Sequence, residues 1–146
     1  MLKVGNKAPN FSAPDQNGEL HSLEDYQGKW LLLYFYPRDN TPGCTKEACA
    51  LRDNYPQFAS DKVAVIGVST NSVASHEKFA TKFNLPFTLL ADTDKKIIHD
   101  YEANGLLRRI SYIINPQGII AKTYDKVKVE SHASEVLNDL SVLIKG

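Results

Sequence analysis

The sequence has no net charge, and this absence excludes several classes of partner. Its 146 residues carry 17 lysine and arginine side chains against 17 aspartate and glutamate side chains, so the formal net charge is zero. A chain without excess positive charge has no electrostatic footprint for nucleic acid or for an anionic lipid surface. We therefore expect neither a nucleic-acid partner nor a membrane partner.

Long hydrophobic runs are also missing. The longest, Trp30–Tyr36, is far shorter than the ~20 residues that span a bilayer. The opening stretch MLKVGNKAPNFSAPD has no apolar segment of signal-peptide length. These absences predict a cytoplasmic protein. The length of the chain and its 42% hydrophobic composition predict one domain, residues 1–146, with a core of ordinary size.

Cysteine is scarce. The only two, Cys44 and Cys49, lie five positions apart in the stretch PRDNTPGCTKEAC. A single disulfide bridge between residues so close together would stabilise a domain of this length poorly. In a reducing cytosol, two cysteines are more often catalytic or metal-binding than structural. The stretch therefore has three possible interpretations: a disulfide bridge, a metal-binding site or a pair of reactive thiols.

A metal site would need further ligands, and the sequence offers none nearby. There is no second cysteine pair and no His-x3-His spacing, and no histidine lies within a few residues of the cysteines. We therefore expect no metal. Each of the four histidines is interpreted as a surface or capping residue: His21, His76, His99 and His132.

Apolar runs rich in aromatic and β-branched residues predict buried strands. They are Trp30–Tyr36, Val63–Val68, Thr88–Leu90 and Ile110–Ile114. Near-continuous apolar strands are typical of a sheet that is covered on both faces. Asn115–Gly118 has the composition of a hairpin turn that leads into a strand over Ile119–Tyr124, and Asp15–Gly18 has the same turn chemistry near the N-terminus.

Helices are predicted between these strands. Thr41 is a candidate N-cap followed by proline at the first helical position, and Cys44, Ala48, Leu51 and Tyr55 then recur on one helical face. Two further helices are predicted, over Ser72–Phe83 and Ser131–Ile144. Strands that alternate with helices predict an α/β fold with a central mixed sheet and helices on both faces.

Helix geometry bears on the bridge. If Cys44 and Cys49 lie on one unbroken helix, their Cα atoms are ~8.6 Å apart. A disulfide needs Cα atoms within about 7 Å. The folded helix therefore cannot hold this bridge without opening locally, so any bridge between the two cysteines belongs to a second conformation.

Cys44 has two interpretations that the spacing leaves open. It follows Thr41-Pro42-Gly43 in the first helical turn, where unpaired backbone N–H groups and the helix dipole stabilise a thiolate over a thiol. That position suits a nucleophile. Free cysteine is also a common small apolar residue, and Cys44 shares its helical face with Ala48 and Leu51.

The pattern Pro37-x-x-x-Thr41-x-x-Cys44 resembles the PxxxTxxC active-site motif of the peroxiredoxins. Cys49 resembles the resolving cysteine of the bacterioferritin-comigratory protein, or peroxiredoxin Q, subfamily. The likeness extends over nearly the whole chain, from GNKAPNFSAPDQNG through Arg109–Ile114 to His132. It implies a thioredoxin-like fold and a thiol peroxidase that acts in antioxidant defence, with no metal or organic cofactor.

The resemblance also implies roles for individual residues. Cys44 attacks the peroxide, the Thr41 hydroxyl positions thiolate and substrate, and Pro37 shields the sulfur. Arg109 arrives from a distant strand, where an always-charged side chain with several donors suits the site. The backbone N–H groups of Gly43 and Cys44 face the substrate. Glu47 orients Arg109, although a glutamate in a first helical turn is also ordinary dipole chemistry.

Two adjacent arginines compete for one of these roles. Because side chains alternate along an extended chain, Arg108 and Arg109 point to opposite faces and only one can reach the thiolate. The family pattern of arginine, any residue, threonine or serine, then an aromatic residue selects Arg109. Arg108 is then expected to be exposed to solvent.

After attack, Cys44 becomes a sulfenic acid, which a nearby thiol can condense with. The resemblance implies that Cys49 is that thiol, that the product is an intramolecular disulfide, and that thioredoxin or a related dithiol reductant reopens it. Members of the subfamily are often monomers. Two alternatives remain: a dithiol–disulfide exchange protein, which usually carries C-x-x-C, and a thioredoxin-fold module that binds metal or a partner without catalysis.

Overall fold

A five-stranded mixed sheet forms the centre of the computed structural model, which describes residues 1–105 and 109–146. The strand order is β5-β4-β3-β6-β7. The strands are β3 (Trp30–Phe35), β4 (Val63–Ser69), β5 (Thr88–Ala91), β6 (Ile110–Ile114) and β7 (Ile120–Tyr124). β3, β4 and β5 run parallel, whereas β6 is antiparallel to both β3 and β7. The predicted mixed sheet is confirmed.

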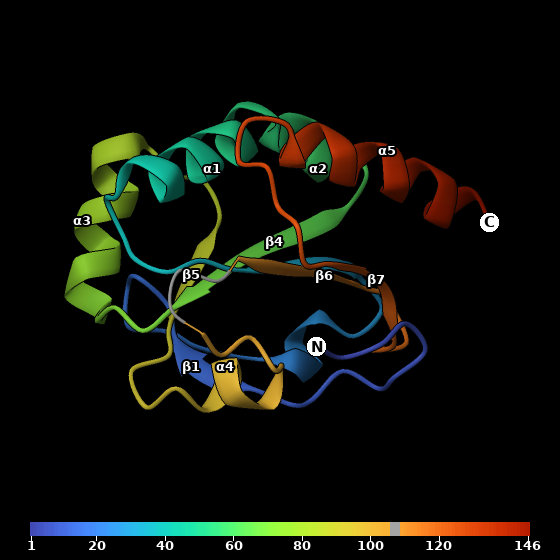
Figure 1. Ribbon diagram of the computed structural model, residues 1–146, viewed down its shortest axis with the longest axis horizontal. Helices are drawn as coiled ribbons and strands as arrows, with labels where there is room; N and C mark the ends of the chain where they lie inside the picture. The colour runs from blue at the N-terminus through green and yellow to red at the C-terminus, as the bar shows by residue number, and fades with distance from the viewer. Residues whose placement is uncertain (106–108) are drawn as a thin grey trace.

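Helices cover both faces of the sheet, as predicted. They are α1 (Pro42–Asp53), α2 (Tyr55–Ser60), α3 (Val73–Phe83), α4 (Lys96–Asp100) and α5 (His132–Lys145). In Figure 1, α1, α2 and α5 lie along one face, whereas α4 lies on the other. Beside α4 is a small hairpin of β1 (Ser12–Pro14) and β2 (Leu20–Ser22), followed by the short 3-10 helix Leu23–Tyr26.

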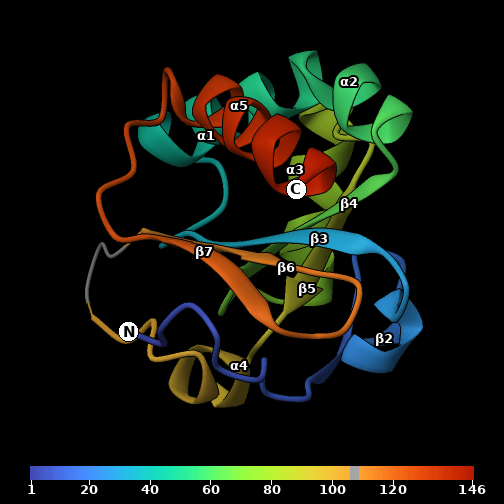
Figure 2. The same cartoon turned by 90° about the vertical axis from the view of Figure 1, so that its right-hand side faces the viewer.

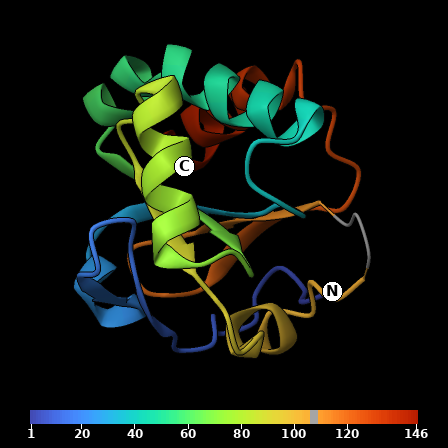
Figure 3. The same ribbon diagram turned by 90° about the vertical axis from the view of Figure 1, so that its left-hand side faces the viewer.

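The same layering is visible from the side. Figure 2 shows α5 running alongside α1 above the sheet. Figure 3 shows α3 on the side of the molecule where β5 forms the edge of the sheet. No helix among the residues the structure describes is long and apolar enough to cross a membrane.

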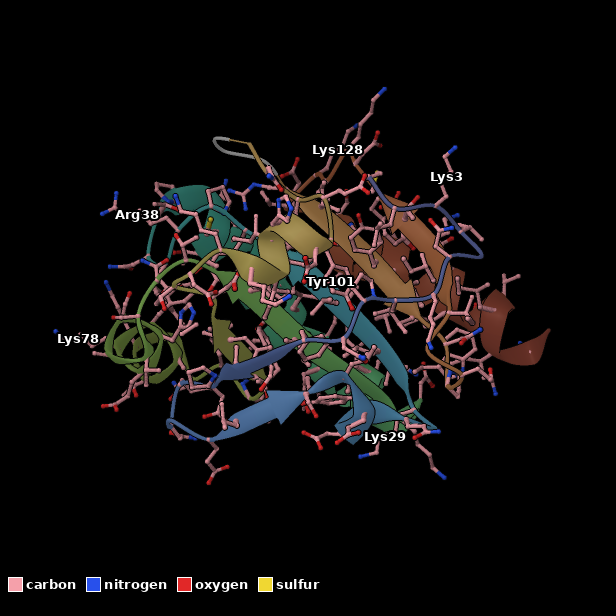
Figure 4. The ribbon with its side chains drawn as sticks, turned by 90° about the horizontal axis from the view of Figure 1, so that it is seen from below. Lys3, Lys29, Arg38, Lys78, Tyr101 and Lys128 are labelled. Atoms are coloured by element: carbon pink, nitrogen blue, oxygen red, sulfur yellow. The ribbon has the colours of Figure 1, made fainter. Side chains whose placement is uncertain are left out.

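Alternate residues of β3 point into two separate cores, because successive side chains in a strand face opposite ways. Leu32 and Tyr34 belong to the cluster beneath α1 and α5. Leu31, Leu33 and Phe35 belong to the cluster on the α4 face. Figure 4 looks onto that second face, where Tyr101 lies near the middle beside α4. The prediction of a sheet buried on both sides is therefore confirmed.

Both predicted turns form, and each is held by one carboxylate or amide side chain. Asn115 Oδ1 accepts from the backbone N–H groups of Gln117 and Ile119, at 3.0 Å in each case. Asp15 Oδ1 does the same for Asn17 and Glu19, at 2.8 and 3.0 Å. These side chains replace a backbone partner, which is why asparagine and aspartate favour such turns.

One helix boundary differs from the prediction. Tyr55 was expected on the same helical face as Cys44, but α1 ends at Asp53 and Tyr55 begins α2. Pro56 explains the break, since proline lacks the N–H that would bond to the carbonyl of Arg52 if α1 continued. α4 and the 3-10 helix were not predicted, because elements of four or five residues carry no helical periodicity.

Candidate active site

Both cysteines lie on α1 and both are free thiols. Cys44 is the third residue of the helix and is 2% exposed, whereas Cys49 is partly exposed. The helix is unbroken from Pro42 to Asp53, which confirms that the two thiols share one helix. The separation of ~8.6 Å between their Cα atoms therefore applies, and α1 as folded is incompatible with a bridge.

Pairing between β3 and β6 brings Arg109 to the cysteine. Phe35, at the end of β3, lies opposite Ile110, at the start of β6. Arg109 immediately precedes Ile110, so it lies beside the turn that leads from β3 into α1. Its guanidinium lies close enough to the Cys44 side chain to interact with it electrostatically. Burial lowers the pKa of Arg109, but the contacts with Cys44 and Glu47 outweigh burial and raise it above its ordinary value.

Gly43 makes room for this arginine. A Cβ atom at Gly43 would lie 2.6 Å from Arg109 Nη2 and 3.5 Å from Cζ, and the first of these distances is closer than real Cβ contacts come. The guanidinium therefore rests against the Cα of Gly43, in the turn of α1 that carries Cys44. Any larger residue at this position would push the charged end of Arg109 aside.

Glu47 holds the other side of the guanidinium. Arg109 Nη1 donates to Glu47 Oε1 at 2.9 Å, and the glutamate side chain is 1% exposed. Burial raises the pKa of Glu47 to about 7, although the positive charge and hydrogen bond of Arg109 act in the opposite direction. Glu47 is thus a buried acid with a single positive partner, placed one turn after Cys44.

Two buried oxygens near this pair have no hydrogen-bond partner among the described residues. They are Glu47 Oε2 and the hydroxyl of Tyr34. Burial raises the pKa of Tyr34 well above its ordinary value, and the nearby Glu47 and Cys44 raise it further. The Tyr34 ring lies over Gly67 of β4, where a Cβ would come within 2.8 Å of the ring. Unpaired buried oxygens are unfavourable, and they mark this region as one not optimised for stability alone.

Thr41 occupies the predicted N-cap position, but its hydroxyl does not cap the helix. Its backbone is extended and its carbonyl accepts from Thr45 N at 2.8 Å, as an N-cap should. The hydroxyl instead donates to the carbonyl of Arg38 at 3.1 Å. The predicted capping bond is therefore absent, and no donor in the described part of the chain occupies the lone pairs of the hydroxyl oxygen. Pro37 lies half-buried in the bend directly after β3.

The structure thus gathers Cys44, Arg109, Glu47 and Gly43 into contact, with Thr41 at the helix start. The predicted exposure of Arg108 concerns a residue outside the described part of the chain. Among the described residues, no group of three or more histidine, cysteine, aspartate or glutamate side chains could hold a metal. Sequence reasoning missed Asp39, a buried acid in the turn between Pro37 and Thr41, because most of its partners lie more than 30 positions away in the chain.

Comparisons with known proteins agree with one another. The sequence pattern of the AhpC/TSA family matches residues 4–123. The chain is 40% identical to peroxiredoxin Bcp of Bacillus subtilis over 149 residues, covering 95% of each protein. The crystal structure of a cysteine-to-serine mutant of Xylella fastidiosa PrxQ has a TM-score of 0.95 at 31% identity, and the match covers 99% of this chain and 98% of that one.

A further solved relative is the Xanthomonas campestris bacterioferritin comigratory protein, described by its alkyl peroxide reduction activity and by trapped intermediate and ligand complexes. Its TM-score is 0.88 at 30% identity, and the match covers 90% of each chain. The predicted thioredoxin-like fold is therefore confirmed.

Proposed function

This chain belongs to the AhpC/TSA family and is a peroxiredoxin of the Bcp and PrxQ type, and on that premise we propose that it reduces hydrogen peroxide and organic hydroperoxides through Cys44. The observation that carries the proposal is the contact between the Arg109 guanidinium and Cys44 at the first turn of α1. The alkyl peroxide reduction described for the Xanthomonas campestris relative supports the organic substrates.

The first step is attack by the Cys44 thiolate on one oxygen of the hydroperoxide. The S–O bond forms as the O–O bond breaks, so the sulfur is oxidised to a sulfenic acid and the other oxygen leaves as an alkoxide or hydroxide that takes up a proton. Negative charge moves from sulfur to the leaving oxygen. Arg109 lies where it can stabilise that charge, because its guanidinium contacts both the thiol and Glu47.

Three further groups position the peroxide in this proposal. The Thr41 hydroxyl donates to Arg38 O, so its oxygen is oriented to accept a hydrogen bond from the incoming hydroperoxide. The backbone N–H groups of Gly43 and Cys44, in the first helical turn, have no helical partner and can donate to a peroxide oxygen. Pro37 shields the sulfur from bulk water at the end of β3.

The second step is condensation of the Cys44 sulfenic acid with the Cys49 thiol. The S–S bond forms as the S–O bond breaks, and water leaves. Because α1 holds the two Cα atoms ~8.6 Å apart, its first turns must unwind before the sulfurs can meet. A dithiol reductant, thioredoxin or a related protein, then takes up the oxidising equivalents and returns both thiols. We place this cycle in cytoplasmic antioxidant defence.

One experiment tests both steps. Limiting hydrogen peroxide is added to the reduced protein, and the product is analysed by intact mass and by amide hydrogen exchange. The Cys49→Ser variant should gain one oxygen on Cys44 within milliseconds, and the wild type should instead lose two hydrogens. Amides of residues 41–55 should lose protection in the disulfide form. Oxidation of Cys44 no faster than free cysteine would refute the peroxidase, and identical protection in both forms would refute the unwinding.

A further inference from the structure

A buried histidine–aspartate pair lies behind the turn that carries the active-site residues. His76 of α3 is 0% exposed, and its Nδ1 lies 2.7 Å from Oδ2 of Asp39, whose side chain is 3% exposed. Asp39 belongs to the turn between β3 and α1. The prediction that each histidine is a surface or capping residue is therefore wrong for His76. It is also wrong for His132, which is 1% exposed and whose Nε2 lies 2.9 Å from the Ser111 hydroxyl.

Both ring nitrogens of His76 face oxygen acceptors. Nε2 lies 2.9 Å from the carbonyl oxygen of Leu90 on β5, which can only accept, so Nε2 carries a proton. A further proton must then lie between Nδ1 and the Asp39 carboxylate, on the ring or on the acid. The pair is neutral as a whole in either form, and this neutrality lets two ionisable groups be buried together.

The carboxylate of Asp39 is fully engaged by other donors. Tyr36, at the end of β3, donates its hydroxyl to Oδ1 at 2.6 Å, and Ser75 of α3 donates to Oδ2 at 2.8 Å. The Asp39 backbone N–H donates to Asn71 Oδ1 at 2.9 Å, in the segment between β4 and α3. One residue of the turn is thus tied to a strand end, a loop and a helix.

These ties act on the residues proposed to handle the peroxide. Asp39 lies two positions after Pro37 and two before Thr41. Asn40, between Asp39 and Thr41, has a φ of +59°, a left-handed conformation that asparagine tolerates better than most non-glycine residues. The hydrogen bonds of Asp39 hold the chain directly before this residue. The anchored Asp39 thereby fixes the position of the Thr41 hydroxyl and the point at which α1 begins.

The hydrogen-bond partners of Asp39 among the described residues all lie outside α1. They belong to Tyr36 directly after β3, to the β4–α3 segment, to α3 and, through His76, to β5. The turn therefore has an anchor that is independent of the helix proposed to unwind. When α1 opens to form the disulfide, this anchor can stay in place and guide the helix back.

We propose that Asp39 and His76 are positioning residues for peroxide reduction: they hold the Pro37–Thr41 turn so that Thr41 and Cys44 meet the peroxide in reactive geometry. This inference rests on the proposed peroxidase function. Neither side chain touches the substrate. Their loss should slow the oxidation of Cys44, because small displacements of reacting groups reduce rates steeply.

The test uses the rate of Cys44 oxidation, measured as competition between the full-length protein and a haem peroxidase for limiting hydrogen peroxide. Asp39→Ala should lower the rate between about 10-fold and 100-fold. Asp39→Asn should stay within about twofold of the wild type, because its amide can donate to His76 Nδ1 and to the rotated Ser75 hydroxyl while its oxygen still accepts from Tyr36. A purely structural role would give no such rescue of the rate.

The chain offers a matched control in a second histidine–aspartate pair. His21 Nε2 lies 2.7 Å from Asp15 Oδ2 in the β1–β2 hairpin, on the face of the sheet opposite α1 (Figure 1). Asp15→Ala should lower stability and leave the oxidation rate unchanged. If Asp39→Ala does not fold, His76→Gln replaces it, because glutamine can keep only one of the two ring contacts.

The outcomes separate this inference from the proposed function. A wild type that reacts no faster than free cysteine refutes the peroxidase itself. A fast wild type with an equally fast, folded Asp39→Ala or His76→Gln variant overturns the positioning role. It is also overturned if Asp15→Ala slows oxidation as much as Asp39→Ala, or if Asp39→Asn is as slow as Asp39→Ala.

Discussion

The two faces of the central sheet bury aromatic side chains of the same kind but treat their polar atoms differently. On the α4 face, the Tyr101 hydroxyl donates to Pro9 O and the Tyr112 hydroxyl donates to Tyr101 O, both at 2.6 Å. On the α1 face, the Tyr34 hydroxyl and Glu47 Oε2 are buried without a partner among the described residues. One face satisfies its buried polar groups, and the other leaves two unsatisfied.

The difference lies where the chemistry is proposed to take place. Tyr34 and Glu47 surround Cys44 and Arg109, whereas the α4 face carries none of the proposed catalytic residues. Native proteins pair nearly all buried polar groups, so exceptions call for an explanation. A low-dielectric pocket strengthens the interaction between a guanidinium and a developing oxyanion. We infer that the α1 face gives up some stability for that interaction.

The largest expected effect comes from removing the charge on the α1 face. Arg109→Leu should lower the rate of Cys44 oxidation by about 10²- to 10³-fold, because the leaving oxygen loses the charge that we propose stabilises it and Glu47 loses its partner. The rate is measured by competition for limiting hydrogen peroxide. A change of less than about threefold would contradict the role of Arg109.

Two variants sharpen this prediction. Gly43→Ala keeps the charge but displaces it, since the new Cβ would overlap Arg109 Nη2, and should lower the rate by about tenfold. Arg52→Leu is the control, because Arg52 lies on the same helix but bonds to Asp53 and to Phe83 O, away from Cys44. It should leave the oxidation rate unchanged.

The next effect is on stability, through Glu47. In the unfolded chain a glutamate loses its proton near pH 4.5, whereas the buried Glu47 keeps it until about pH 7. Between these values the folded protein binds more protons, so the free energy of unfolding should fall as the pH rises from about 4.5 to 7. The expected fall is on the order of 2–3 kcal/mol.

Urea denaturation at several pH values measures this slope. Glu47→Gln should remove it, because an amide does not titrate. Glu77→Gln, at an exposed position of α3, should keep it. A wild-type stability that rises with pH across this window would show that Glu47 is ionised throughout and that the ion pair with Arg109 outweighs burial.

The smallest effect compares one tyrosine from each face. Tyr34→Phe should leave the free energy of unfolding unchanged or raise it by about 0.5–1 kcal/mol, because it removes a hydroxyl that has no partner among the described residues. Tyr101→Phe should lower it by about 1–2 kcal/mol, because it leaves Pro9 O without its donor. Thermal and urea denaturation of both variants would check the pair. Equal losses of unfolding free energy in the two variants would mean that the Tyr34 hydroxyl has a hydrogen-bond partner in solution.

Much of the fold follows from local patterns. The apolar runs predicted four strands of the central sheet, the Asn115 turn predicted the fifth, and Asp15 predicted the turn of the β1–β2 hairpin. Errors arose where local signals were weak or in competition. Tyr55 matched a helical face, but Pro56 started a new helix, and α4 is too short to show a period.

The residues of the candidate site likewise fall into those that local patterns predict and those that only tertiary contacts bring together. Thr41, Pro42 and Cys44 could be placed from adjacent residues, because a helix start is a local structure. Arg109 was selected by resemblance to a family, not by periodicity. Its contact with Glu47 spans 62 positions, and no pattern in a single sequence encodes such a pairing. The capping bond expected of Thr41 did not form: the hydroxyl is oriented to donate to Arg38 O, and its oxygen accepts from no first-turn N–H of α1.

By itself, the sequence determined that two thiols share a helix on which they cannot be joined, because helical rise and rotation depend only on the number of residues between them. Tertiary structure alone decided which charges surround the first thiol. The β3–β6 register brings Arg109 to Cys44, and the packing of α3 brings His76 to Asp39 across 37 positions. Such contacts depend on how strands and helices pack in space, and that packing is a property of the whole chain.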